Sequence, residues 1–394
     1  MRILLLSFYF PPDLSAGSFR ARALVEALQA EAGHSLSLDV ITTAPNRYQS
    51  HQVVAPEIEE TGSLRIHRVS LPAHQSGMRD QAKAFSVFAR RVLALTRGRR
   101  WDLVIATSSR LMTAALGARI AKRSGAKLYL DIRDLFTDTM GDLLSESSLR
   151  YLLPLFERLE RRTLRRADRV NVVSAGFLPH MHKALPEQSV RTFTNGIDDE
   201  FLQVNFLKSE SDRSQLPLIV YAGNIGEGQG LHRVVPYAAK RLEGRTRFRI
   251  IGDGGRRAQL EDGLAEAGTK NVELLPPVPR SELFEHYRDA DIMFLHLNDH
   301  SAFQKVLPSK IFEYAATGKP ILAGVAGYAA EFLLSEMPGV EVFTPCDSGA
   351  MADAAERLLN IGQVVGCETF CKRYARESIM REFAKDILAL GKSS

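Results

Sequence analysis

Short apolar runs alternate with helical patterns along the whole chain, and this alternation constrains the fold more than any other feature. The run 3–8 is followed by apolar residues at helical spacing from Phe19 to Leu28, and Gly33 is expected to end that helix. Another apolar run spans 36–42, and later runs follow at 103–106, 128–130 and 170–173. Strands that alternate with helices predict a parallel sheet covered by helices on both faces.

The pattern restarts after a polar stretch at 208–215, which we interpret as a linker. The apolar runs that follow it are 218–221, 248–251, 272–275, 292–295, 321–323 and 340–343. A length of 394 residues fits about two domains. The sequence therefore predicts an α/β fold with two facing Rossmann-like domains, parallel sheets and an interdomain cleft. We expect the domains to be 1–200 and 201–375, with a C-terminal helix 376–394 that packs back on the first domain.

Composition and targeting signals exclude several classes of protein. Hydrophobic residues make up 45% of the chain and charged residues 25%, as in ordinary globular proteins. No apolar stretch approaches the roughly 20 residues that span a bilayer. The first ten residues resemble a signal peptide, but Pro11 and Pro12 follow without a small-residue cleavage site, which favours a core strand. Cys346, Cys367 and Cys371 match no disulfide framework or common zinc pattern, so we expect reduced thiols.

The positive charge lies in the first half of the chain. Residues 1–200 hold 28 Lys and Arg against 21 Asp and Glu, whereas 201–394 hold 23 against 25. Two amphipathic patterns, 83–100 and 152–169, carry many of these cations. Each predicts either a helix that covers the sheet or one that lies on an anionic membrane surface. Covering is favoured for both, and more strongly for the second. Aromatic residues are not interleaved with the cations, so nucleic acid fits less well.

Three loops follow predicted strands and have the composition of ligand-binding turns. They are 11–20, which contains Gly17 and opens a helix, the glycine-rich segment 223–230, and the turn 252–255. Ligands bind at the carboxyl ends of parallel strands, where helix N-termini present free N–H groups. None of the three is a Walker A loop or a dinucleotide-binding fingerprint, which makes a dehydrogenase a poor interpretation.

The segment 306–322 is the most informative. Ser309 is expected to cap a helix that runs to Ala316, and Lys310 falls in its first turn, where a cation opposes the helix dipole unless an anion also binds. Glu313, one turn later, is placed to bind a ribose diol. The alternative is a surface ion pair between Lys310 and Glu313. The sequence alone leaves both interpretations open.

With this segment the chain resembles GT-B glycosyltransferases of family 4, in the branch that builds bacterial surface polysaccharides and includes transferases of N-acetylated amino sugars. The resemblance rests on an ordered set of marks along the chain. These marks are 10–12 with 17–20, 33–34, 131–134, Ser174, 195–198, 223–226, 251–254, 289–291 and 307–320.

The resemblance implies a retaining transfer of a sugar, of the N-acetylated amino class, from a nucleotide-diphosphate donor, UDP-linked by expectation, to a lipid-linked or saccharide acceptor. Lys310, Arg133 and Asp134 are the implied catalytic residues. The implied donor-binding residues are Gly17, Arg20, Gly223, Asn224, Gly226, Gly252, Asp253, Val278, Leu307, Pro308, Ser309, Lys310 and Glu313. The family needs no cofactor or metal ion, and the nucleotide sugar is a co-substrate.

The chain departs from the family pattern at three positions. Lys305 stands where the family often has the first Glu of a Glu-x7-Glu pair, and Asn224 and Gln229 stand where it has Arg and Lys. We expect Lys310 to replace part of the missing charge opposite the leaving diphosphate. His296 and His300 lie four residues apart but near an extended segment, so we expect no metal site there.

Two other functions remain as alternatives. A nucleotide-sugar 2-epimerase would share the fold and the donor, and a basic nucleic-acid-binding protein would use the charge of the first half. We expect a cytoplasmic protein with peripheral contact at the inner face of the cytoplasmic membrane, through the basic first domain and the helix near Phe85 and Phe88, and no nucleic-acid partner.

Overall fold

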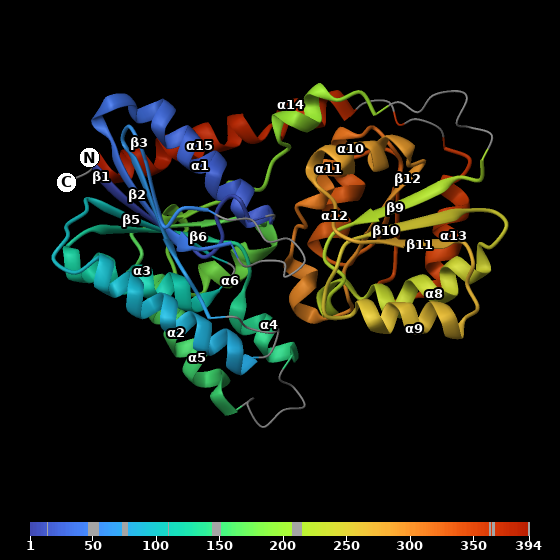
Figure 1. The fold of residues 1–394 in the computed structure, drawn as a ribbon, viewed down its shortest axis with the longest axis horizontal. Coiled ribbons are helices and arrows are strands. Elements are labelled where there is room, and N and C mark those ends of the chain that lie inside the picture. Colours follow the sequence, from blue (N-terminus) through green and yellow to red (C-terminus); the bar gives the residue numbers. More distant parts are fainter. Residues whose placement is uncertain are drawn as a thin grey trace. The chain divides into compact units, whose positions relative to one another are not determined.

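The computed structural model describes residues 1–13, 15–45, 55–72, 78–108, 110–143, 151–206, 215–361, 364 and 367–392. The predicted linker 208–215 lies outside these ranges except for Gln215. The chain divides into unit 1, Met1–Asn195 with Arg376–Ser394, and unit 2, Gly196–Ala375. Figure 1 shows the elements of both units.

Unit 1 is built on a sheet that has eight strands among the described residues, in the order β3-β4-β2-β1-β5-β6-β7-β8. All neighbours are parallel except β3, which pairs antiparallel with β4. The strands are β1 (Arg2–Ser7), β2 (Ser37–Thr43), β3 (Ile58–Thr61), β4 (Leu64–Val69), β5 (Leu103–Ser108), β6 (Lys127–Ile132), β7 (Arg169–Val172) and β8 (Val190–Arg191). The helices are α1 (Ala16–Ala32), α2 (Met78–Leu95), α3 (Leu111–Ser124), α4 (Phe136–Leu143), α5 (Leu153–Arg166), α6 (Leu178–His182) and α15 (Arg376–Lys392).

Helices lie on both faces of this sheet, because successive strand residues point to opposite sides. Ile3 and Leu5 of β1 pack in the core cluster that contains α1 and α15. On the other face Gly117 of α3 lies against Leu6 and Ala106, and α2, α3 and α5 lie side by side (Figure 1). The predicted helix stop at Gly33 is confirmed, since Gly33 is the C-cap of α1 with φ of 56°.

The terminal helix α15 is held to unit 1 by a polar network as well as by its apolar face. Asp386 accepts hydrogen bonds from Tyr129 Oη (2.7 Å), Arg169 Nη1 (2.6 Å) and Arg191 Nε (3.2 Å). These three donors come from β6, β7 and β8. The last helix of the chain is therefore part of the first domain's structure.

Unit 2 contains a parallel sheet of six strands among the described residues, in the order β11-β10-β9-β12-β13-β14. The strands are β9 (Leu218–Ala222), β10 (Arg247–Ile251), β11 (Val272–Leu275), β12 (Ile292–His296), β13 (Ile321–Gly324) and β14 (Val340–Phe343). The helices are α7 (Asp199–Gln203), α8 (Leu231–Arg241), α9 (Arg257–Glu266), α10 (Arg280–Asp289), α11 (Lys310–Ala316), α12 (Tyr328–Glu336), α13 (Ser348–Leu358) and α14 (Cys367–Arg373). The chain reverses its direction across the sheet between β9 and β12, as in doubly wound Rossmann folds.

Two hydrophobic clusters lie on the two faces of this second sheet. Leu218 and Val220 of β9 pack with α10, α11 and α12, whereas Ile219 and Tyr221 pack with α8, α9 and α13 (Figure 1). The apolar runs that the sequence predicts as strands in this half all form strands of this sheet. The prediction of an α/β fold with parallel sheets is thus confirmed.

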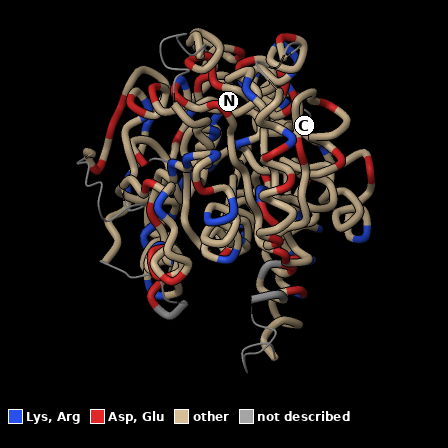
Figure 2. The backbone as a smooth tube through the Cα atoms, turned by 90° about the vertical axis from the view of Figure 1, so that its right-hand side faces the viewer, with Lys and Arg blue, Asp and Glu red and all other residues tan. Residues whose placement is uncertain are grey.

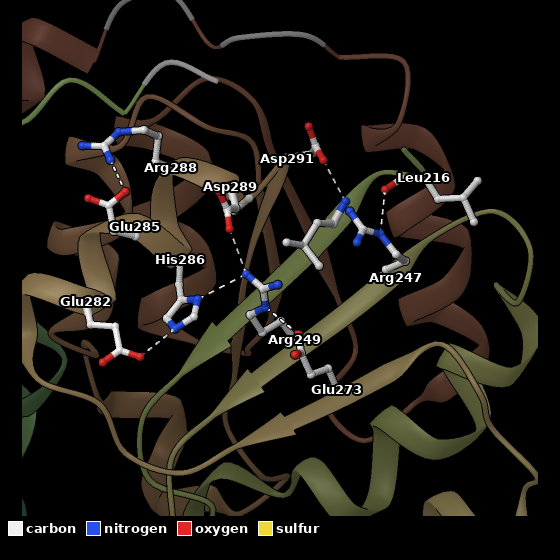
Figure 3. A network of polar contacts seen from close by, with 12 residues as sticks. Leu216, Arg247, Arg249, Glu273, Glu282, Glu285, His286, Arg288, Asp289 and Asp291 are labelled. Carbon is white, nitrogen blue, oxygen red and sulfur yellow. Dashed lines mark hydrogen bonds and ion pairs between the residues drawn. The ribbon is translucent and has the colours of Figure 1, made fainter. Parts of the chain in front are cut away.

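A network of charged residues ties α10 to the sheet (Figure 3). Arg249 of β10 donates to Glu273 Oε2 (2.7 Å) and Asp289 Oδ2 (3.0 Å), and its Nη1 lies 3.2 Å from His286 Nδ1. Burial, with the charge of Arg249, lowers the pKa of His286. Asp291 Oδ2 accepts from the Leu218 amide (2.8 Å). The 289–291 mark of the family therefore has a structural role here.

No described helix combines the length and the apolarity that crossing a bilayer requires.

Candidate functional site

The predicted site residues of unit 2 gather where the sheet reverses its winding. Gly223 follows β9, and Lys310 opens α11 in the connection from β12 to β13. Because the connections of two strands diverge at this point, their carboxyl ends leave room for a ligand.

Lys310 lies against the backbone of the first glycine. A Cβ at Gly223 would lie 2.5 Å from Lys310 Cε and 2.6 Å from its Nζ. The rings of Tyr221 and Tyr314 flank the ammonium, whose Nζ is 5.6 Å and 5.9 Å from their centroids. These distances are within the range of cation–π attraction. The two tyrosines are residues that sequence reasoning missed, because both read as core positions.

The ammonium of Lys310 makes no hydrogen bond or ion pair with any residue that the structure describes. Burial lowers the pKa of Lys310 below its ordinary value, and the charge of Glu313 opposes that effect. Glu313 is nevertheless not within ion-pair distance, so the surface pair between Lys310 and Glu313 does not form. A partly buried cation without a partner is costly unless an anion joins it.

The two glycine turns of unit 2 pack directly on each other. Gly223 N donates to Ile251 O (2.8 Å), and a Cβ at Gly252 would collide with Gly223 O. Gly252 has a φ of 145°, a conformation that favours glycine. Asp253 Oδ1 accepts from Gly254 N (2.8 Å), so this carboxylate shapes its own turn. Gly252 is therefore needed for the close approach of the two loops.

The loop after β9 is closed by an amide pair. Asn224 Nδ2 donates to Gln229 Oε1 (2.7 Å), and a Cβ at the buried Gly226 would contact Asn224 Nδ2. The amides that replace the family's Arg and Lys thus bind each other. In this conformation the loop is neutral at both positions.

The start of α11 differs from the prediction in one respect. Ser309 is the N-cap residue of α11, which ends at Ala316 as predicted, but its backbone is helical and its side chain makes no capping hydrogen bond. Leu307 is buried in the core, which leaves only its backbone for a ligand. Pro308, Ser309 and Glu313 are half-buried. Val278, also half-buried, follows β11 and packs on the core cluster below α10 and α11.

Unit 1 shows a matching arrangement of glycine and cation. Gly17 lies in the first turn of α1, and a Cβ there would collide with the guanidinium of Arg133. Arg133 follows β6, makes no hydrogen bond to another described residue, and has a pKa lowered by burial. Asp134 is half-buried beside it, and its charge partly offsets this shift.

Arg20 is a correction to the predicted donor contacts. Its side chain has no exposed area and pairs with the equally buried Asp131, with Nη2 and Oδ1 2.9 Å apart. It also donates to the carbonyls of Thr194 (2.8 Å) and Phe193 (2.8 Å). Burial alone would raise the pKa of Asp131, but Arg20 and hydrogen bonds from its neighbours lower it. Arg20 therefore holds α1 to β6 and cannot touch a ligand directly.

Sequence reasoning also missed the role of His296, at the carboxyl end of β12. Its Nδ1 lies 2.6 Å from Gln229 O, and Cys346 N donates to its Nε2 (2.9 Å). A carbonyl only accepts and an amide N–H only donates, which fixes the neutral Nδ1–H tautomer. Burial lowers the pKa of His296 to about 4. His296 thus holds the glycine-rich loop 223–230 through a hydrogen bond to Gln229. Both ring nitrogens have hydrogen-bond partners, so His296 is no metal ligand.

Among the described residues, no three or more His, Cys, Asp or Glu side chains are grouped so as to hold a metal ion.

Two family models match the chain. A glycosyl transferase 4-like domain matches residues 17–196, and the glycosyl transferases group 1 model matches residues 216–360. A relative in Escherichia coli K12, named a putative colanic acid biosynthesis glycosyl transferase (WcaI), is 27% identical over 98% of this chain and all of its own length.

Solved structures share the fold over the whole chain. The sucrose-phosphate synthase of Thermosynechococcus elongatus has a TM-score of 0.77 at 16% identity, with both chains covered in full. Anabaena HepE, solved with UDP and glucose, has a TM-score of 0.69 at 15% identity, with 99% of each chain covered. The family models account for most of both units, and the chain belongs to the GT-B glycosyltransferases, with a family-4-like domain at its N-terminal side.

Proposed function

We propose that the chain is a retaining glycosyltransferase that moves an N-acetylated amino sugar from a UDP-linked donor to a lipid-linked or saccharide acceptor in cell-surface polysaccharide synthesis. The name of the E. coli relative supports the polysaccharide assignment, and the UDP in the HepE structure supports the nucleotide. The segment 308–314 supports the amino sugar through its resemblance to that branch. The product is an O-antigen, capsule or exopolysaccharide in this proposal.

The observation that carries the proposal is the unpaired ammonium of Lys310 against Gly223. It lies beside two backbone turns at the carboxyl end of a Rossmann sheet, and Glu313 follows one helical turn later. A diphosphate would supply the missing negative charge, and the Glu313 carboxylate accepts hydrogen bonds from a ribose diol. Positive charge fixed in advance stabilises a leaving group better than mobile water does.

In the proposed reaction, the bond between the anomeric carbon and the diphosphate oxygen breaks, and its electron pair leaves with UDP. The acceptor hydroxyl oxygen forms the new bond on the face that the diphosphate leaves, and its proton passes to a phosphate oxygen. Lys310 and backbone N–H groups stabilise the negative charge, so the scheme uses no metal ion. Arg133 and Asp134 act near the sugar, as the resemblance implies, and Gly17 contributes from unit 1.

A panel of UDP-sugars with and without saccharide acceptors tests this function. UDP release that requires an acceptor supports a transferase. A changed sugar without UDP release would identify an epimerase, and no turnover with any pair would reject both. Lys310→Ala should lower turnover by about 100-fold or more with an unchanged melting temperature. The control, Lys270→Ala, removes an exposed lysine before β11 and should change neither.

Peripheral contact with the cytoplasmic membrane, a cytoplasmic location and the absence of a nucleic-acid partner stay predictions.

A further inference from the structure

A groove of about 1040 Å³ lies on unit 1 between α2, α3 and α5. Its apolar lining comes from all three helices and includes Leu93, Leu116 and Leu159. Among the described residues that line the groove, seven are cations and none carries a carboxylate. These cations are Arg119, Lys122, Arg158, Arg161, Arg162, Arg165 and Arg166. A groove with an apolar floor and cations at its rim is suited to bind an anionic amphiphile.

Among the described residues, the cations of the groove have almost no carboxylate partners. Within the described part of the chain, only Arg166 has a carboxylate in ion-pair range, with Nη1 3.8 Å from Asp168 Oδ2. Arg158 and Arg162 are exposed, lie one turn apart on α5 and make no hydrogen bond to a described residue. Figure 2 shows Lys and Arg interspersed with Asp and Glu along much of the backbone, whereas the described lining of the groove holds cations and no carboxylate.

The apolar strip of the groove continues onto the exposed part of α5. Leu155 lies one turn before Leu159 on the same face and is 64% exposed, and Leu152 is 45% exposed. Within α5 only Thr163 and Leu164 are buried. The second amphipathic pattern, α5, therefore packs beside α3 as a covering helix and still leaves part of its apolar face exposed. The first pattern, α2, has Phe88 and Val92 fully buried, so Phe88 is not available to a membrane.

We propose that this groove binds an acidic phospholipid at a bilayer surface, with the phosphate held by the arginines of α5 and an acyl chain lying over Leu93, Leu116 and Leu159. A helix with exposed leucines and a cationic face binds where anionic headgroups meet acyl chains. Nucleic acid would leave the apolar floor unused. The inference gives the proposed membrane contact a site, and it is measured without donor or acceptor. Its failure would therefore leave the transferase proposal untouched.

Vesicle co-sedimentation of the full chain tests the charge requirement. We expect binding to phosphatidylcholine vesicles that contain phosphatidylglycerol, weakening with salt, and no binding to phosphatidylcholine alone. Arg158→Glu/Arg162→Glu should weaken binding at least tenfold. The matched control, Arg90→Glu/Arg91→Glu, makes the same charge change at exposed positions of α2 outside the groove and should keep it. Equal loss in both variants, or no binding by the wild type, would overturn the proposal.

A second variant tests the groove itself. Ala115 is half-buried in the lining, so Ala115→Trp fills the floor without changing a charge. We expect it to lose at least tenfold in affinity for soluble dihexanoyl-phosphatidylglycerol, measured by calorimetry, while its melting curve stays cooperative. Should the tryptophan unfold unit 1, Met112→Glu at the 39% exposed rim replaces it, with the same expected loss. Unchanged lipid affinity, or tighter binding of a DNA duplex than of the lipid, would refute the lipid site.

Discussion

In each unit the charged end of one side chain lies against the α-carbon of a glycine. Both glycines lie near the point where the strand order of the sheet reverses. Gly17 faces Arg133, and Gly223 faces Lys310. Neither cation makes a hydrogen bond to another described residue. A side chain at either glycine would occupy the space of the cation, so both glycines keep a positive charge beside the backbone.

Gly17→Ala tests this role in unit 1. Its backbone is helical, so alanine causes no strain and should raise stability by about 0.5–1 kcal/mol. The three atoms nearest to the added Cβ all belong to the guanidinium of Arg133, which must move away. We expect turnover to fall about 10- to 100-fold while the melting temperature stays equal or rises.

Gly141→Ala is the matched control, because nothing lies near a Cβ at that helical position. It should leave turnover unchanged. Full activity of Gly17→Ala would show that the position of Arg133 does not matter.

Gly223→Ala tests the same relation in unit 2 through a double-mutant cycle. Alone it should reduce turnover, because its Cβ displaces the Lys310 amine and because a φ of 152° strains alanine. In a Lys310→Ala background there is no amine for the added Cβ to displace. The loss of turnover caused by Gly223→Ala should therefore be at least about fivefold smaller than in the wild type. Kinetics of the four proteins measure this, and additive losses would mean that the two residues act independently.

The sequence predicted residues of the site only where the chemistry was local. Lys310 and Gly223 were found because each follows an apolar run, and parallel strands bring such positions to one edge. The buried ion pair of Arg20 could not be predicted from the sequence, because its partner Asp131 lies far along the chain and only the folded sheet brings the two together. Tyr221 and Tyr314 were missed because a buried tyrosine looks like any core residue until its neighbour is known.

At the scale of elements, apolar runs predicted the strands well, because parallel strands are buried on both faces. The hairpin β3–β4 was not predicted: β3 is exposed along its whole length and lacks such a run. The two basic amphipathic helices have similar patterns, yet α2 buries Phe88 and Val92 completely, whereas α5 leaves Leu152 and Leu155 exposed. Their difference depends on what packs against them, which a pattern does not contain.

Strand β12 ends in a histidine that should make unit 2 sensitive to acid. The pKa of His296 is about 4 when folded and ordinary, near 6.5, when unfolded. The unfolded chain therefore takes up a proton first. The contribution of neutral His296 to the free energy of unfolding is complete above pH 6.5. It is lost as the pH falls towards 4, by up to about 3 kcal/mol.

Chemical denaturation of the wild type and His296→Gln between pH 7 and 4 measures this effect. Glutamine can keep one donor and one acceptor but does not titrate, so its stability should fall less steeply. His232 and His286, whose pKa values are also lowered by burial, remain in both proteins and cancel. Parallel curves would exclude His296 as the source of acid sensitivity.

At the scale of the whole molecule, unit 2 is an insertion into unit 1. The chain leaves unit 1 after Asn195 and returns at Arg376. The two crossings meet in unit 2, where Ile197 N donates to Tyr374 O (2.8 Å) and Ile197 bridges to Ala375. Unit 2 thus has adjacent ends and its own core, whereas unit 1 needs the last helix of the chain.

Ending the chain after Ala375 should therefore destabilise unit 1, although the rest of that unit, 1–195, lies far from the cut in sequence. Helix α15 buries Phe383, Ile387 and Leu388 in the core of unit 1, and each such side chain is worth roughly 1.5–3 kcal/mol. Their combined loss, with the Asp386 network, approaches the whole stability of a typical domain, about 5–15 kcal/mol. Limited proteolysis of the truncated chain should digest 1–195 and spare 196–375, and a separately expressed 196–375 should unfold cooperatively. A truncated chain in which 1–195 resists the protease would show that α15 is dispensable.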